Sequence, residues 1–162
     1  RVEGPTNSVD QRIKRLSKEL DLLENEYSVL DVEQSNIFWK KTKNLEVFSN
    51  TKKNLIRLVV PVSETLNLLQ KLKNVDLSYF LDWGGSLIWL ELNDISIKIL
   101  NELKDITKDH NGYFTLIKVE EDMKASADIF TIDPIKYKIS EKIKKSFDPR
   151  RIFNPGKMYT GI

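Results

Sequence analysis

Cysteine is absent from this chain of 162 residues, and histidine occurs once, at His110. The lack of cysteine excludes disulfides, thiolate metal sites and iron–sulfur ligation by this chain. A single histidine argues against a metal site built on imidazoles. No apolar run approaches the ~18 residues that a membrane span needs, and no signal peptide is visible. The remaining prediction is a globular domain, and a hydrophobic content of 40% is enough for a buried core.

Glycine is also scarce, and its placement excludes the common phosphate-binding loops. The chain has 6 glycines, and neither GxGxxG nor GxxxxGK[ST] occurs. We therefore expect no dinucleotide-binding loop in this chain. Charge gives no pointer to nucleic acid, because 26 basic residues are offset by 24 acidic ones. The chain begins Arg1-Val2-Glu3-Gly4 without Met, which predicts a fragment of a longer protein.

The middle of the chain predicts a sheet with helices on one face. Strand patterns at 54–60, 76–83, 86–92 and 113–119 alternate with helix patterns in the order β-α-β-β-α-β. Gly84-Gly85 predicts a two-residue hairpin. The expected fold is α+β, with a ferredoxin-like antiparallel sheet of four strands. The same order fits an RNA-recognition domain, but the strands lack the required glycine and aromatic pattern, so this is a minor alternative.

Helices are also expected before and after the sheet region in the sequence. Ser8 and Gln11 form a plausible capping box for a helix over about 9–26, and Ser63 and Asp94 are the predicted caps of the two middle helices. Asp31 is predicted to open a second helix, and 40–54 is predicted to be a loop. Asp133-Pro134 opens a last helix, in which Ile135, Ile139 and Ile143 are spaced by four. Pro149 ends that helix. The predicted segments are a helical lead-in over 1–53, a sheet domain over 54–120, and a C-terminal helix with a tail over 121–162.

Three local features have both a structural and a functional interpretation. Trp83-Gly84-Gly85 is either a hairpin turn with a tryptophan on one sheet face or a ligand contact. His110 lies where a helix ends, so it is either a capping or surface residue or a general base. The lysines of the last helix, with Arg150 and Arg151, form either a solvated face or a surface for phosphate or an acidic partner.

Three stretches in this order and spacing resemble the C-terminal half of the GlcE-type subunit of bacterial glycolate oxidase, an FAD-linked oxidase related to vanillyl-alcohol oxidase. They are Leu55-Ile56-Arg57-Leu58-Val59-Val60-Pro61, the Trp83-Gly84-Gly85 hairpin with its flanking strands over 81–90, and Phe147-Asp148-Pro149 followed by Asn154-Pro155-Gly156-Lys157-Met158-Tyr159. The resemblance covers about Arg1 to Tyr159 and is weakest between Ser28 and Thr51.

This resemblance implies a cap domain that covers the flavin ring on the substrate side. FAD would be held by an N-terminal domain that is not in this chain, so no cofactor is expected on the fragment alone. The implied reaction is oxidation of a small 2-hydroxy acid, glycolate to glyoxylate. The implied partners are the FAD-binding domain, a paralogous flavoprotein and an iron–sulfur subunit. The implied location is cytoplasmic, with the complex as a route to membrane association.

The tail carries the residues that the resemblance places near the flavin. Asn154, Gly156 and Lys157 are the candidate cofactor contacts, with Asn154 as a hydrogen-bonding group, Gly156 permitting close approach and Lys157 offsetting negative charge. Alternatively, Asn154-Pro155-Gly156 is only a turn that locks the tail onto the missing domain. The related enzymes with a His-rich metal site differ here, because one histidine cannot build that site. The alternative function is a non-catalytic protein-interaction module or the remnant of a split flavoprotein.

Overall fold

The computed structural model describes residues 1–20, 28–48, 54–120, 123, 127–131, 133–157, 159 and 162. By their internal contacts the residues divide into two units, Arg1–Asn50 and Thr51–Ile162. The first unit contains the helices α1 (Thr6–Glu19) and α2 (Val32–Lys43) and the short 3₁₀ helix η1 (Glu46–Phe48). None of the described helices is long and apolar enough to cross a membrane.

The second unit is built on a four-stranded antiparallel sheet with strand order β2-β3-β1-β4. Its elements in chain order are β1 (Asn54–Val59), α3 (Val62–Lys71), β2 (Leu77–Asp82), the 3₁₀ turn η2 (Trp83–Gly85), β3 (Leu87–Leu92), α4 (Ile97–Asp109), β4 (Tyr113–Lys118) and α6 (Pro134–Phe147). The element order and the strand order confirm the predicted ferredoxin-like α+β fold. Phe130 adds an isolated bridge to Thr115, outside the named strands.

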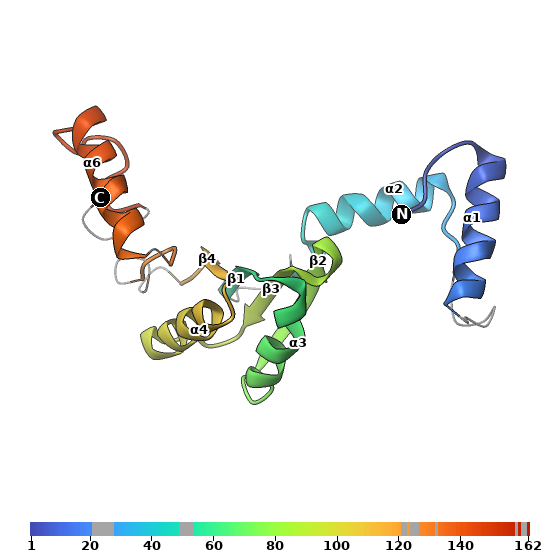
Figure 1. Cartoon of the computed structure of the whole chain (residues 1–162), viewed down its shortest axis with the longest axis horizontal. Helices are drawn as coiled ribbons and strands as arrows, with labels where there is room; N and C mark the ends of the chain where they lie inside the picture. The colour runs from blue at the N-terminus through green and yellow to red at the C-terminus, as the bar shows by residue number, and fades with distance from the viewer. Residues whose placement is uncertain are drawn as a thin grey trace. The chain divides into compact units, whose positions relative to one another are not determined.

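The helices of the β-α-β-β-α-β core cover one face of this sheet. The helices α3 and α4 lie on the same side of the strands (Figure 1), and their buried leucines pack with every second residue of β1, β3 and β4. Ile56 and Leu58 of β1 are fully buried in this core, while the intervening Arg57 is only partly buried. This alternation places Arg57 on the face opposite to the two helices.

Three predicted boundaries of the second unit are wrong by a few residues. Ser63 does not cap α3: the helix begins after Pro61, whose carbonyl accepts a hydrogen bond from the Glu64 amide at 2.8 Å. Ser96 caps α4 in place of Asp94, since its hydroxyl accepts from the Ile99 amide at 3.2 Å. The hairpin is longer than two residues, because β2 ends at Asp82 and β3 begins at Leu87.

The first unit confirms one predicted cap and corrects another. Asp31 and Gln34 form a complete capping box at the start of α2. Ser8 lies inside α1 rather than at its cap, because the Pro5 carbonyl accepts from the Ser8 amide at 2.9 Å and the helix begins at Thr6. The predicted loop over 40–54 is in fact helical through Lys43 and again in η1. The predicted end of the first helix falls at residues 21–27, outside the described residues.

A close approach between α4 and β1 gives the first prediction. A Cβ atom at Gly112 would lie 2.5 Å from Val60 Cγ1, 2.8 Å from Thr107 Cγ2 and 2.9 Å from the Val59 carbonyl. Gly112→Ala should therefore lower the free energy of unfolding by about 1–3 kcal/mol, measured by urea denaturation. Ser63→Ala, at an exposed position of α3, is the control and should change stability by less than about 0.5 kcal/mol. Equal stability of Gly112→Ala and the native chain would contradict this packing.

Candidate functional site

The turn between β2 and β3 holds three consecutive residues in the left-handed conformation. Trp83, Gly84 and Gly85 have φ angles of 53°, 65° and 100°. A tryptophan in this conformation costs about 1–2 kcal/mol. Backbone strain of this kind persists only where neighbouring contacts fix it, and it concentrates at functional sites.

Side-chain hydrogen bonds fix this strained turn from both sides. The Asp82 carboxylate accepts from the Trp83 amide at 2.7 Å, and the Ser86 hydroxyl donates to the Trp83 carbonyl at 3.1 Å. Thr65 of α3 donates its hydroxyl to the Gly85 carbonyl at 2.6 Å. Trp83 nevertheless stays 58% exposed. Burial of the indole therefore does not offset the strain, and the turn presents this ring at the surface.

Arg57 lies beneath the presented indole. Its guanidinium carbon is 5.4 Å from the centroid of the Trp83 ring, within the range of a cation–π contact. Its Nε is buried and has no hydrogen-bond partner among the residues that the structure describes. In the strand register, Trp89 of β3 and Thr115 of β4 are the direct neighbours of Arg57. This face therefore combines an arginine with free hydrogen-bonding capacity and two tryptophans.

The sequence interpretation did not select Arg57. The signal was a lone charged residue in an otherwise apolar strand, at a position where the period of two turns it away from Ile56 and Leu58. Trp83 and Trp89 were expected to have packing roles. Trp89 is partly buried in the sheet, whereas the exposure of Trp83 goes beyond packing.

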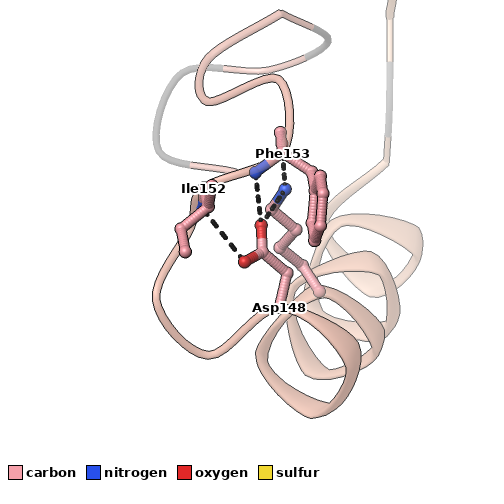
Figure 2. A network of polar contacts seen from close by, with 4 residues as sticks. Asp148, Ile152 and Phe153 are labelled. Atoms are coloured by element: carbon pink, nitrogen blue, oxygen red, sulfur yellow. Dashed lines mark hydrogen bonds and ion pairs between the residues drawn. The ribbon is translucent and has the colours of Figure 1, made fainter.

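The tail after α6 is folded around one buried carboxylate, Asp148. Its two oxygens accept from the backbone amides of Ile152 at 2.9 Å and Phe153 at 3.0 Å (Figure 2). Lys144, one turn earlier in α6, lies 2.8 Å from the same carboxylate and also donates to the Phe153 carbonyl. The side-chain hydrogen bond from Lys144, followed by the two amides, lowers the pKa of Asp148 to about 2. We call this arrangement the Asp148 clamp.

The candidate cofactor residues follow directly after the clamp. Asn154, Gly156 and Lys157 are all exposed. Asn154 and Gly156 have φ angles of 47° and 67°, and the Lys157 amide donates to the Asn154 carbonyl at 3.2 Å, so these residues form a turn. The structure thus brings the three residues together at the surface, with no described side chain within 4 Å of a Cβ at Gly156.

His110 is the C-cap residue of α4, which confirms the predicted capping role, but it is buried rather than on the surface. Its Nδ1 lies 2.8 Å from Glu64 Oε2 in the first turn of α3. The other ring nitrogen, Nε2, is buried and finds no hydrogen-bond partner in the described part of the chain. Because neither ring nitrogen faces solvent, the pair joins two helices rather than forming an accessible base.

A broad groove of about 840 Å³ lies between α4, β4 and α6. Its aromatic lining includes Tyr137 and Tyr159, whose ring centroids are 6.2 Å apart. Burial lowers the pKa of Lys104, and the charges of Asp128 and Asp105 oppose that shift. The lining carries Lys104, Lys108 and Lys136 against Asp105, Asp128 and Asp133. Equal numbers of opposite charges give this groove no preference for an anion.

Comparisons of this chain with protein-family models, with curated proteins and with solved structures give no match. Among the described residues, no group of three histidine, aspartate or glutamate side chains is arranged to hold a metal ion. The features that point to a function are therefore the hairpin face around Arg57 and Trp83 and the C-terminal segment.

The link between α3 and α4 gives the second prediction. Glu64→Ala leaves both ring nitrogens of buried His110 without a partner, so we expect the free energy of unfolding to fall by about 1–3 kcal/mol. Thermal and urea denaturation measure this change. Glu102→Ala is the matched control, because Glu102 is exposed and lies 3.8 Å from Lys98 in a surface pair; it should change stability by less than about 0.5 kcal/mol. Similar losses in both variants would argue against a special role for the buried pair.

The Asp148 clamp gives the third prediction, on pH. A lowered pKa means that the stabilising effect is complete above the ordinary aspartate value of about 3.9. It is lost as the pH falls towards about 2. The amide resonances of Ile152 and Phe153 should move together with a midpoint near that pH, and Asp148→Ala should move them at neutral pH. Asp109→Ala in α4 is the control. A midpoint near the ordinary aspartate pKa would show that the clamp does not form in solution.

Proposed function

We propose that this chain is the C-terminal cap domain of an FAD-linked oxidoreductase subunit that resembles the GlcE-type subunit of glycolate oxidase. In the proposed protein, FAD is bound mainly by a separate flavin domain, and a small 2-hydroxy acid is oxidised to the 2-oxo acid. The observation that carries the proposal is an apolar surface on the C-terminal segment that has no partner among the described residues of the unit.

This surface, which we call the α6 stripe, consists of side chains spaced by four along the helix. Ile135, Ile139, Ile143 and Phe147 are each more than half exposed, and α6 has no buried residue. Ile152 and Phe153 of the tail are exposed as well. Contiguous apolar surfaces of this kind are typical of interfaces rather than of free monomers. A second domain of the same protein is the partner that the resemblance implies.

The clamp prepares this surface for docking. By holding the amides of Ile152 and Phe153, Asp148 keeps the tail folded next to α6. The two segments border an apolar groove of about 550 Å³ lined by Ile143, Phe147 and Phe153. Because the clamp fixes the tail in advance, less conformational entropy is lost when a partner binds. The rigid tail supports a docking role.

The turn at Asn154–Lys157 is the proposed contact with the cofactor. Its exposed amide and ammonium groups are available for a ligand, and the positive charge of Lys157 suits a phosphate or a reduced flavin. The groups are too few to hold FAD alone, and the chain has no glycine-rich phosphate loop. The paralogous flavoprotein and the iron–sulfur subunit are proposed partners of the complete subunit.

The α6 stripe equally favours the alternative function, a protein-interaction module without catalysis. The coding sequence upstream of Arg1 discriminates between the two. A glycine-rich flavin domain in frame, or encoded next to this chain, favours the oxidoreductase, whereas its absence favours the interaction module.

The fourth prediction tests the proposed function. We expect the isolated 162 residues to purify colourless, whereas the native protein that contains this chain, tagged and purified from its own cells, should be recovered with stoichiometric FAD. Ile143→Asp places a charge in the stripe and should abolish the recovery of flavin, because the charge is buried at the interface without a partner. Lys138→Ser, on the same helix but outside the stripe, is the control. Visible absorbance and glycolate-dependent dye reduction are the measurements.

Two outcomes would contradict the proposal. A yellow isolated chain with stoichiometric FAD would show that the cofactor site is within these residues. Recovery from native cells without any flavin would instead favour the interaction module.

A further inference from the structure

We propose that Arg57 and Trp83 form a binding site for the carboxylate of a small organic acid. The site consists of the Arg57 guanidinium, the Trp83 indole over it and Thr115, the register partner of Arg57 on β4. It deepens the proposed function, because it assigns the carboxylate of the 2-hydroxy acid to residues of this chain. Its binding test does not depend on the flavin.

Arg57 has hydrogen-bonding capacity that the described residues leave unused. Nε is buried and has no acceptor, and Arg57 makes no ion pair with the residues that the structure describes. A guanidinium matches a carboxylate through two parallel hydrogen bonds, which are stronger than neutral ones. Arg57 comes from β1, an interior strand of the sheet, so its backbone is held on both sides.

A strained turn places Trp83 over this arginine. Three hydrogen bonds hold the turn: the Asp82 carboxylate accepts one, and the hydroxyls of Ser86 and Thr65 donate the other two. They stabilise a left-handed backbone conformation that is unfavourable in free energy for tryptophan. The product of this arrangement is an exposed indole at 5.4 Å from the guanidinium carbon. The ring fixes the plane of the guanidinium and supplies an apolar wall for the carbon atoms of a ligand.

The charged residues around Arg57 favour a ligand with a single negative charge. On the same face, Asp82 of β2 and Glu91 of β3 lie in the neighbouring rows of the register. Lys118, opposite Leu55 on β4, adds one further cation, so the two cations and two carboxylates leave no excess of positive charge for a doubly charged phosphate. Thr115, which pairs directly with Arg57 on β4, offers a hydroxyl to a second polar group of the ligand. A short hydroxy acid has both groups.

The fifth prediction is a titration of the ¹⁵N-labelled chain with glycolate, followed by NMR. We expect the Arg57 Nε–H and the Trp83 indole N–H resonances to shift, with the indole assigned through Trp83→Phe. Arg57→Gln should weaken binding by about tenfold or more, because it removes the charge-assisted pair. Arg57→Lys keeps the charge without the fork and should also weaken binding. Arg150→Gln, an exposed arginine of the tail, should bind glycolate as the native chain does.

Each other outcome overturns the proposal. Unchanged affinity in a folded Arg57→Gln or Arg57→Lys variant would exclude the site. The absence of shifts at Arg57 and Trp83 in the native chain would exclude it as well. Tighter binding of inorganic phosphate than of glycolate would exclude the preference for a monocarboxylate. Since none of these measurements involves FAD, the site can fail while the flavin test succeeds, and the reverse is also true.

Discussion

The register of β1 between β3 and β4 is the constraint on which the other features depend. Because side chains alternate along a strand, Ile56 and Leu58 enter the core only if Arg57 points to the opposite face. A slip by one residue would place the guanidinium among apolar side chains and expose the isoleucine and the leucine to water. The pairing that forms the core therefore also determines where the one charged side chain of this strand lies.

The strained turn depends on the same pairing. The β2–β3 register ends with Asp82 opposite Leu87, which leaves four residues to connect the two strands. Thr65 reaches the turn from α3, a helix that is itself fixed by the core beneath the sheet. The turn is thus held by two local hydrogen bonds, to Asp82 and from Ser86, and by one contact from a distant part of the sequence, Thr65. The position of the indole over Arg57 therefore requires the folded sheet together with α3.

This dependence explains which features could be predicted from the sequence. The period of two in the strands and the local cap at Asp133 are short-range signals, and both correctly predicted their elements. The hairpin was predicted too short because the hydrogen bond from Thr65 joins residues twenty positions apart. Asp148 was expected only to end α6, since nothing in its spacing indicates two amides bound beyond Pro149. Arg57 could not be selected from the sequence, because its contact with Trp83 forms only in the folded structure.

The two candidate surfaces differ in chemistry, and this difference fits one division of roles. The hairpin face offers a guanidinium and an indole, which suit a small polar ligand. The α6 stripe offers isoleucine and phenylalanine side chains without a central polar group, which suits a protein surface but no small acid. The Asp148 clamp continues this apolar surface through Ile152 and Phe153 and delivers the turn at Asn154 directly beyond it. A domain docked on the stripe would therefore contact that turn at the edge of the same interface. A cofactor bound by that domain would have to lie at this edge for Asn154 and Lys157 to contact it.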